Sequence, residues 1–378
     1  MKTLRRIAVA VPAACRTAAL LACLGMAACA PPEPVRIGFI GGTSGRVADL
    51  GIAGRDAVLL AVDLRNQAGG VAGRKVEVLV RDDRQDPERA REVARDLIAQ
   101  GVAGIVGPMT SAMAVATVPV TDAAGVVLVS PTASTDLLTG KDDSFFRVNA
   151  STLDNASRIA RHHAARQATR RLAVAYDLGN KAYAESWLDG FRAAYLEGGG
   201  ELVKVIPFSS GGDETFLALA NSLLATRPDG VLTVANSMDT ALLCQQIRKL
   251  DARIPILTSE WAATERLIEL GGKAVEGVVV AQNFDRDSSA PAYRAFLEAY
   301  RARFHREPGF GGVIAFDAAN VMMQALARRK PGQGLKEAIL ADPRFDGVQE
   351  PVTFDAFGDV RRSLFITVVR DGRFVVVE

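Results

Sequence analysis

The chain has 378 residues, which is enough for two domains of ordinary size. It is 49% apolar and 23% charged, a composition that is typical of globular proteins and excludes both a disordered chain and a membrane protein with many spans. The formal net charge of +2 excludes a strongly basic chain of the kind that binds nucleic acid.

Residues 1–28 have the pattern of a secretion signal. They begin with the basic segment MKTLRR and continue with an apolar run, whose uninterrupted part is shorter than the about 20 residues that a membrane span needs. The segment MAAC, which ends at Cys29, resembles the lipobox of bacterial lipoproteins. This resemblance implies cleavage before Cys29, a lipid on its sulfur and a tether at 29–34. The segment LLAC, which ends at Cys23, is a competing lipobox.

Removal of residues 1–28 would leave a chain of 350 residues with 41 basic and 43 acidic side chains. The resulting net charge of −2 gives no indication of a nucleic-acid partner. Cys244 is then the only internal cysteine, so we expect neither a disulfide within one chain nor a cysteine metal site.

From residue 35 the chain alternates strand-length apolar segments with longer amphipathic segments. The expected strands of the first half lie at 35–40, 75–80, 104–107 and 126–130, and its expected helices at 56–67, 86–101 and 111–125. After a pause at 142–151, the expected strands lie at 171–177, 201–208, 230–235 and 254–260, and the expected helices at 180–200, 213–230 and 239–251. A strand at 277–284, helices at 290–304 and 311–327, and a β-rich end from residue 350 complete the pattern.

This alternation predicts parallel sheets that are covered by helices on both faces. We therefore expect an α/β fold of two Rossmann-like lobes joined by a hinge, with a seam near 150–152. Lobe 1 is assigned to 35–150 plus 281–347, and lobe 2 to 151–280 plus 348–378.

The glycine-rich turn GGTSG after the first strand invites comparison with a nucleotide site. The glycines at 38, 41, 42 and 45 lack the GxGxxG spacing, and Asp82-Asp83 lies nearly twice too far along the chain to be the acid that holds a ribose. The phosphate-binding pattern GxxxxGK[ST] does not occur. We therefore interpret these glycines as a tight strand-to-helix turn beside a cleft.

Catalytic motifs are missing from the sequence as well. GGTSG is one residue away from the GxSxG pattern of hydrolases, and only three histidines are present, at 162, 163 and 305. They give too little material for a Ser-His-Asp triad or a histidine metal site. We therefore expect no enzymatic activity, no metal and no cofactor.

Polar side chains gather where the predicted strands end. The segments are GPMTSA (107–112), SPTAST (130–135), YDLGNKAY (176–183), ANSMD (235–239) and TSEWAAT (258–264). Because ligands of open α/β sheets bind at the carboxyl ends of the strands, two facing lobes would gather these groups around one ligand. A single segment of this kind is also typical of a helix cap, and that alternative stays open for each of them.

With these segments in place, the chain resembles the type I periplasmic-binding-protein family, specifically its leucine/isoleucine/valine-binding branch, from residue 35 to about 370. The most specific match is NQAGGVAGRKVEVLVRDDRQDPERA (66–90), which contains a Gly-Gly turn, a strand and an acidic entry to a helix. The segments IGFIGGTSGRVADLG, GIVGPMTSA, VVLVSPTAS and QQIRKLD follow in the order and spacing of the family.

The resemblance implies a site for an α-amino acid. Ser111 matches the serine that holds the α-carboxylate beside a helix N-terminus. The backbone carbonyl of Thr132, the hydroxyl of Ser134 and the carboxylate of Glu260 match the groups that accept hydrogen bonds from the α-ammonium, although the family has threonine at position 134. The alternative for Glu260 is a helix N-cap before WAATERL.

The same resemblance indicates how the rest of the ligand is held. Tyr183 matches a tyrosine that closes over the ligand, and Asn236 stands where the branched-chain binders have another tyrosine, so the exact ligand stays open. The expected side-chain pocket consists of Leu50, Met109, Thr110 and Trp261.

We therefore expect an extracytoplasmic solute-binding protein of an ABC importer, which captures an amino acid by hinge closure and presents it to membrane permease subunits. We expect it to be a monomer, anchored by lipid in the periplasm or at the outer cell surface. The alternatives are a ligand sensor of the same fold, or a binder of another small carboxylate or amide. A periplasmic amidase is a more distant alternative, because the sequence supplies no nucleophile–base pair.

Overall fold

The computed structural model describes residues 32–166 and 169–377, and the elements below belong to the unit that begins at Val35. The predicted signal at 1–28 and both candidate lipidation sites, Cys23 and Cys29, lie outside the described residues. Those predictions therefore stay predictions.

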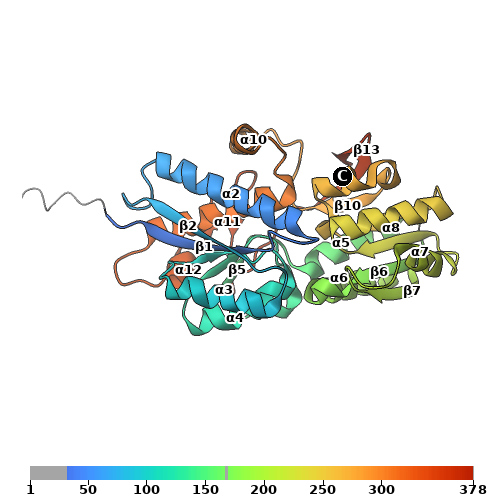
Figure 1. Cartoon of the computed structure of the whole chain (residues 1–378), viewed down its shortest axis with the longest axis horizontal. Coiled ribbons are helices and arrows are strands. Elements are labelled where there is room, and N and C mark those ends of the chain that lie inside the picture. The colour runs from blue at the N-terminus through green and yellow to red at the C-terminus, as the bar shows by residue number, and fades with distance from the viewer. Residues whose placement is uncertain (1–31, 167–168, 378) are drawn as a thin grey trace, which may run out of the picture. The chain divides into compact units, whose positions relative to one another are not determined.

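The first sheet contains five parallel strands in the order β2-β1-β3-β4-β5. Its strands are β1 (Val35–Gly41), β2 (Val76–Asp82), β3 (Ile105–Val106), β4 (Leu128–Ser130) and β5 (Phe145–Arg147). Its helices are α2 (Ala48–Gln67), α3 (Pro87–Ala99), α4 (Ser111–Ala123) and α11 (Gly309–Arg328). Figure 1 shows α2 and α11 on one face of this sheet and α3 and α4 on the other, which is the expected layered arrangement.

The second sheet contains seven strands in the order β14-β13-β10-β9-β8-β6-β7. They are β6 (Arg171–Asp177), β7 (Glu201–Phe208), β8 (Gly230–Val234), β9 (Ile256–Thr258), β10 (Val279–Gln282), β13 (Phe365–Arg370) and β14 (Arg373–Val376). Only β13 and β14 join the sheet antiparallel. The covering helices are α5 (Thr152–Arg166), α6 (Lys181–Glu197), α7 (Phe216–Leu224), α8 (Ser237–Leu250) and α9 (Glu265–Gly271), with α6 and α8 on opposite faces (Figure 1).

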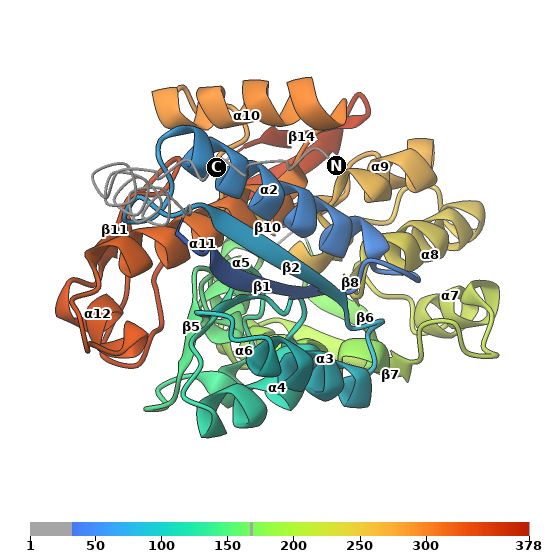
Figure 2. The same cartoon turned by 60° about the vertical axis from the view of Figure 1, so that its left-hand side comes forward.

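The remaining elements lie mainly beside the first sheet. They are α10 (Pro291–Phe304), α12 (Leu335–Ala341), β11 (Arg344–Phe345), β12 (Val352–Thr353), and short 3-10 helices at Asp136–Leu138, Leu178–Asn180, Glu260–Ala262 and Gly272–Val275. Figure 2 shows α12 and β11 next to α11, and α10 above α2. Helix α11 is long and apolar enough to cross a membrane, but it is mostly buried inside the protein, as a core helix is.

The chain passes between the two sheets three times. The passages follow β5, β10 and β12, at 148–151, 283–290 and 354–364. Strand β10 pairs in the second sheet up to Gln282, two residues beyond the predicted boundary at 280. The lobe boundaries themselves stay a prediction, and the sequence-predicted α/β fold of two parallel-sheet lobes is confirmed.

Helix α2 begins eight residues earlier than the predicted helix at 56–67, although this extension contains Gly51 and Gly54. A Cβ at Gly51 would lie 1.9 Å from the carbonyl oxygen of Gly42, and one at Gly54 would lie 2.6 Å from Cε of Met109. The two glycines therefore allow the loop after β1 and the Met109 side chain to lie against the helix, a contact that outweighs their low helix propensity.

Candidate functional site

A small cavity lies between the carboxyl ends of the two sheets. It is lined by Leu50, Met109, Thr110, Ser111, Thr132, Ser134, Asn149, Asn180, Tyr183, Glu260, Trp261 and Phe310. Its volume of about 20 Å³ leaves room for roughly one water molecule. Segments that follow strands of both sheets therefore line this cavity.

The structure brings nine of the ten sequence-predicted ligand and pocket residues to this cavity, and the exception is Asn236. The side chain of Asn236 caps helix α8: its Oδ1 accepts from the backbone N–H of Asp239 at 2.9 Å, and its Nδ2 donates to Asp239 Oδ2 at 2.7 Å. Helix capping, the alternative that the sequence left open, is thus the contact that Asn236 makes here.

Three lining residues were missed by the sequence reasoning. Asn180 lies within the polar segment 176–183, so its position after β6 was a usable signal. Asn149 follows β5 directly at the predicted seam, where a polar residue could also have been considered. Phe310 lies in the first turn of α11 and had no sequence signal, because only the packing of α11 brings it to the cavity.

One end of the cavity is built around Ser111, the first residue of α4. Ser111 is buried, and its Oγ accepts hydrogen bonds from the backbone N–H groups of Ser134 and Thr135 at 3.1 and 3.3 Å. Because a hydroxyl has one proton to donate, that proton is left for a further acceptor. The neighbouring N–H of Ala112 donates to Oδ1 of Asn180 at 2.9 Å. This end of the site is therefore suited to an anion, as helix N-termini are.

The other end is formed by Glu260, whose carboxylate is buried. Its Oε2 accepts from Trp187 Nε1 at 2.8 Å, and its Oε1 accepts from Asn155 Nδ2 at 3.3 Å. Among the described residues no cation forms an ion pair with it. Burial raises the pKa of Glu260, while a backbone hydrogen bond and those from Trp187 and Asn155 lower it. A buried carboxylate without a cation is costly, so this end is suited to a cationic group.

Two hydroxyls of the cavity lining are also open to a ligand. Ser134 Oγ is buried and has no hydrogen-bond partner within 32–166 and 169–377, and the buried Tyr183 OH lies near Ser259 and Glu260 without a hydrogen bond of regular geometry to either. Burial and the nearby negative charge of Glu260 raise the pKa of Tyr183, so its phenol stays protonated. Buried polar atoms without partners are rare in native proteins, and a bound molecule would satisfy these two.

The remaining wall is apolar. The rings of Tyr183 and Trp261 meet edge to face, with their centroids 5.5 Å apart. Leu50, Met109 and Phe310 complete this wall, and each of them is almost fully buried. The cavity thus combines two polar ends of opposite preference with a wall that suits an apolar group.

Polar contacts also join the two lobes near this site. Arg46, in the loop before α2, forms an ion pair of 2.5 Å with Asp239 at the start of α8. Asp49 accepts from Ser237 Oγ at 2.6 Å and from Thr264 Oγ1 at 2.5 Å. These contacts therefore link the two lobes next to Leu50, a residue of the cavity lining.

Within the described ranges, no group of three or more His, Cys, Asp or Glu side chains is arranged to hold a metal ion. Cys244 is buried, which raises the pKa of its thiol to about 12, and it does not line the cavity. The chemistry that this site offers is hydrogen bonding and charge pairing.

Two α/β lobes with a small cavity at the carboxyl ends of their sheets define a two-lobe fold of the ligand-binding class. Residues 34–373 match the family described as Periplasmic binding protein, so the chain belongs to that family. The sequence resemblance to type I periplasmic binding proteins is thereby confirmed. Membership implies a location outside the cytoplasm.

Relatives and solved structures agree with this membership. The chain is 27% identical to the Leu/Ile/Val-binding protein BraC3 of Rhizobium johnstonii, over 92% of this chain and 95% of that protein. The branched-chain amino acid transporter substrate binding protein LivJ from Streptococcus pneumoniae, solved in complex with isoleucine, is 25% identical with a TM-score of 0.84, over 91% of this chain and 99% of that one. A Rhodopseudomonas palustris solute binding protein in complex with benzoate shares the fold at 20% identity and a TM-score of 0.83, over 91% of this chain and 95% of that one.

Proposed function

We propose that this protein is the solute-binding component of an ABC importer and that it captures an α-amino acid with an apolar side chain. The observation that carries the proposal is Glu260, a buried carboxylate at the cavity that has no cation among the described residues. An α-ammonium group would supply that cation. The Ser111 hydroxyl at the start of α4 provides the matching subsite for the α-carboxylate.

The ligand would span the cavity between these two ends. Its carboxylate would accept from the Ser111 hydroxyl at the α4 N-terminus, where the positive end of the helix dipole favours an anion. Its ammonium would donate to Glu260, to Ser134 Oγ and to the carbonyl of Thr132. The hydroxyl of Thr132 is engaged elsewhere, because it donates to the backbone carbonyl of Met109. Charge-assisted hydrogen bonds at both ends would give the site its preference for a zwitterion.

The side chain of the ligand would face Leu50, Met109, Trp261 and Phe310. These residues suit an apolar group, as in the relatives named for leucine, isoleucine and valine. An amino acid does not fit into about 20 Å³, so binding requires hinge opening, entry and closure around the ligand. Met109 is the most adaptable part of this wall, because its side chain is unbranched, and it lies against Gly41 and Gly54.

The proposal also covers the cellular setting. The protein would be exported by the signal at 1–28, anchored by lipid at Cys29 and recognised in its closed form by membrane permease subunits. Binding would be its whole activity, with no chemistry on the ligand. Ser111 supports this, because its Oγ accepts from two backbone N–H groups, and no general base among residues 32–166 and 169–377 is hydrogen-bonded to it.

A thermal-shift screen of the full-length protein, purified in detergent, tests the proposal. A ligand at 100 times its dissociation constant adds about 2.7 kcal/mol of stability, which gives a clear shift in melting temperature. Shifts with α-amino acids, and none with the corresponding amines or carboxylic acids, are expected. If only acids without an amino group bind, Glu260 is protonated in the complex and the protein is a carboxylate binder. Uptake of the labelled ligand by a deletion strain then separates transport, where uptake is lost, from sensing, where it is kept.

A further inference from the structure

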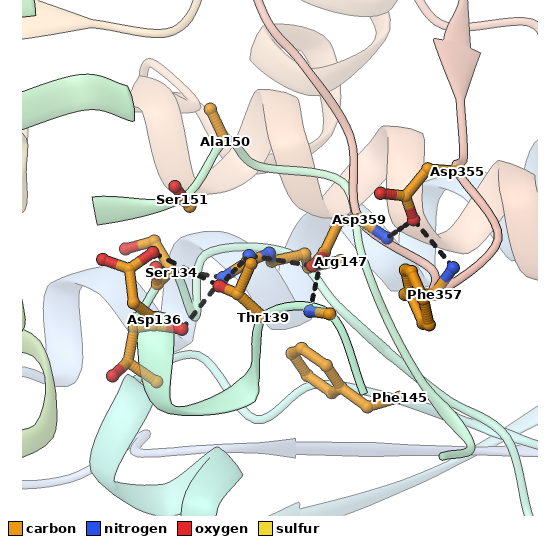
Figure 3. A network of polar contacts seen from close by, with 12 residues as sticks. Ser134, Asp136, Thr139, Phe145, Arg147, Ala150, Ser151, Asp355, Phe357 and Asp359 are labelled. Carbon is orange, nitrogen blue, oxygen red and sulfur yellow. Dashed lines mark hydrogen bonds and ion pairs between the residues drawn. The ribbon is translucent and has the colours of Figure 1, made fainter. Parts of the chain in front are cut away.

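Arg147, the last residue of β5, is fully buried behind the ligand cavity and does not line it. Its Nη1 donates to the backbone carbonyls of Ser134 and Thr135, both at 3.0 Å, and its Nη2 donates to Thr139 Oγ1 at 2.7 Å. Figure 3 shows these contacts converging on the guanidinium from the loop that follows β4. Arg147 thus holds the loop at 134–139, which includes the lining residue Ser134.

The charge of Arg147 is balanced by Asp359, which lies in the passage between β12 and β13. Asp359 Oδ1 lies 2.8 Å from Arg147 Nη2, and Asp359 Oδ2 accepts from the N–H of Gly140 at 2.9 Å. The turn that carries Asp359 is itself fixed, because Asp355 Oδ1 accepts from the backbone N–H groups of Phe357 and Asp359 (Figure 3). The third passage between the lobes is therefore tied to the loop at 134–139.

One peptide group connects this ion pair to the ligand subsite. The carbonyl of Ser134 accepts from Arg147, and the N–H of the same peptide, which belongs to Thr135, donates to Ser111 Oγ at 3.3 Å. Hydrogen bonds in such a chain strengthen one another, so a cation at the carbonyl makes the N–H a stronger donor. The Ser111 hydroxyl in turn becomes a stronger donor to an anion and is held in one orientation.

The loop also has contacts to the second lobe, so Arg147 is not its only support. Asp136 Oδ2 accepts from Thr152 Oγ1 at 2.8 Å and from Ser186 Oγ at 3.1 Å. Neither of these side chains contacts the 134–135 peptide carbonyl that Arg147 holds, although the backbone N–H of Thr152 does, at 2.7 Å. Loss of the Arg147 side chain would therefore leave the loop in place but remove the charge from that peptide.

We propose that Arg147, fixed by Asp359, is a positioning residue that sets the orientation and donor strength of Ser111 for the carboxylate of the ligand. This inference rests on the proposed function, and it adds a residue outside the cavity to the binding machinery. If Arg147 has this role, its substitution should change ligand affinity only when the Ser111 hydroxyl is present. A purely structural role predicts an effect that is independent of Ser111.

A double-mutant cycle distinguishes the two roles. Arg147→Met, Ser111→Ala and the double variant are made in the full-length protein, and affinity for the best α-amino acid from the screen is measured by titration calorimetry. We expect Arg147→Met to weaken binding about tenfold when Ser111 is present and less than about threefold in the Ser111→Ala background. Arg147→Lys keeps the charge and should restore part of the loss, although a lysine lacks the planar fork of arginine.

Asp317→Asn is the matched control, because Asp317 forms an equally buried ion pair with Arg362, at 3.1 Å, away from the 134–139 loop. It should lower the melting temperature and leave affinity unchanged. If Arg147→Met does not fold, Asp359→Asn replaces it in the same cycle. An equal loss of affinity with and without Ser111 would overturn the inference. Absence of α-amino acid binding by the unaltered protein would overturn the proposed function first, and this is measured before any variant.

Discussion

The indole of Trp187 donates to Glu260 across the base of the cavity, with Nε1 2.8 Å from Oε2. Trp187 is fully buried on α6 and stacks on Phe191, with ring centroids 5.2 Å apart, so the donor is rigid. Together with Asn155 it fixes both carboxylate oxygens without neutralising their charge. This arrangement places at the cavity a buried carboxyl group that has no cation among the described residues.

Glu260→Gln should weaken the binding of α-amino acids about 10- to 100-fold, since a hydrogen bond to a charged partner contributes about 1.5–3 kcal/mol. The free energy of unfolding of the unliganded variant should lie within about 1 kcal/mol of that of the original protein. One hydrogen bond is lost, but this loss is offset because the cost of burying a charge is removed as well. Titration calorimetry and chemical unfolding at pH 7 measure the two effects. Glu269→Gln, on the exposed side of α9, is the control and should change neither. Unchanged affinity of the Glu260 variant would exclude an ammonium partner.

Ser111→Ala tests the carboxylate subsite, and Ser130→Ala is its matched control. Both hydroxyls are buried near a strand end, but Ser130 donates to the carbonyl of Pro108 at 2.7 Å, accepts from Ala133 and does not line the cavity. Each variant should lose about 1–3 kcal/mol of stability, because buried backbone N–H groups lose their acceptor. Only Ser111→Ala should also weaken ligand binding, by about tenfold or more. Similar affinities of the two variants would place the carboxylate elsewhere.

The sequence could predict the main contacts of this site because parallel strands end at one edge. Ser111, Ser134 and Glu260 each lie within five residues after a strand, so their place at the carboxyl ends of the two sheets was predictable, and the family resemblance singled them out. Asn236 has the same position after β8, but its spacing to Asp239 is that of a helix cap, a local competitor that the sequence already contained.

Contacts that depend on packing were beyond sequence reasoning. Phe310 reaches the cavity because α11 packs against α2, and no periodicity in either helix specifies that angle. Arg147 and Asp359 are separated by 212 positions, and only the third passage between the lobes brings them together. A buried arginine at the end of a short strand has the same sequence pattern as an exposed one, so the burial of its charge becomes visible only in the folded chain.

Substitution of the adjacent acids Asp82 and Asp83 by asparagine should change the free energy of unfolding in opposite directions at pH 7.5. Burial raises the pKa of Asp83 from 3.8 to about 6, and its Oδ2 has no partner in the described part of the chain. Its folded-state pKa lies above the unfolded value, so the folded protein loses stability as pH rises from about 4 to about 6. Asp83→Asn should therefore stabilise the protein by about 1–3 kcal/mol at pH 7.5 and have little effect at pH 4.

Asp82→Asn is the internal comparison for that experiment. Burial alone would raise the pKa of Asp82, but hydrogen bonds from Ser44, Arg84 and Thr43 lower it overall. The ionised Asp82 therefore stabilises the folded protein at neutral pH, and this stabilisation is lost as pH falls through the lowered pKa. Asp82→Asn should consequently destabilise the protein at pH 7.5. Urea unfolding at both pH values measures the two signs. Destabilisation by Asp83→Asn at pH 7.5 would show that the ionised form is stabilised in the folded protein.

Ligand affinity should depend on pH through Glu260. Burial raises the pKa of Glu260 above its ordinary 4.5, and an ammonium beside it would lower that pKa again on binding. Binding to the protonated carboxyl then releases a proton, so affinity falls as pH is lowered through the raised pKa and is constant above it. Calorimetric titrations between about pH 5 and 8, in buffers of different ionisation enthalpy, measure both the slope of ligand affinity against pH and the number of protons released on binding. Glu260→Gln should abolish both, whereas Asp83→Asn should keep them, although burial raises the pKa of Asp83 to about 6, inside the pH range of the titrations. If the pH dependence of affinity persists in Glu260→Gln and disappears in Asp83→Asn, it comes from Asp83 rather than from Glu260.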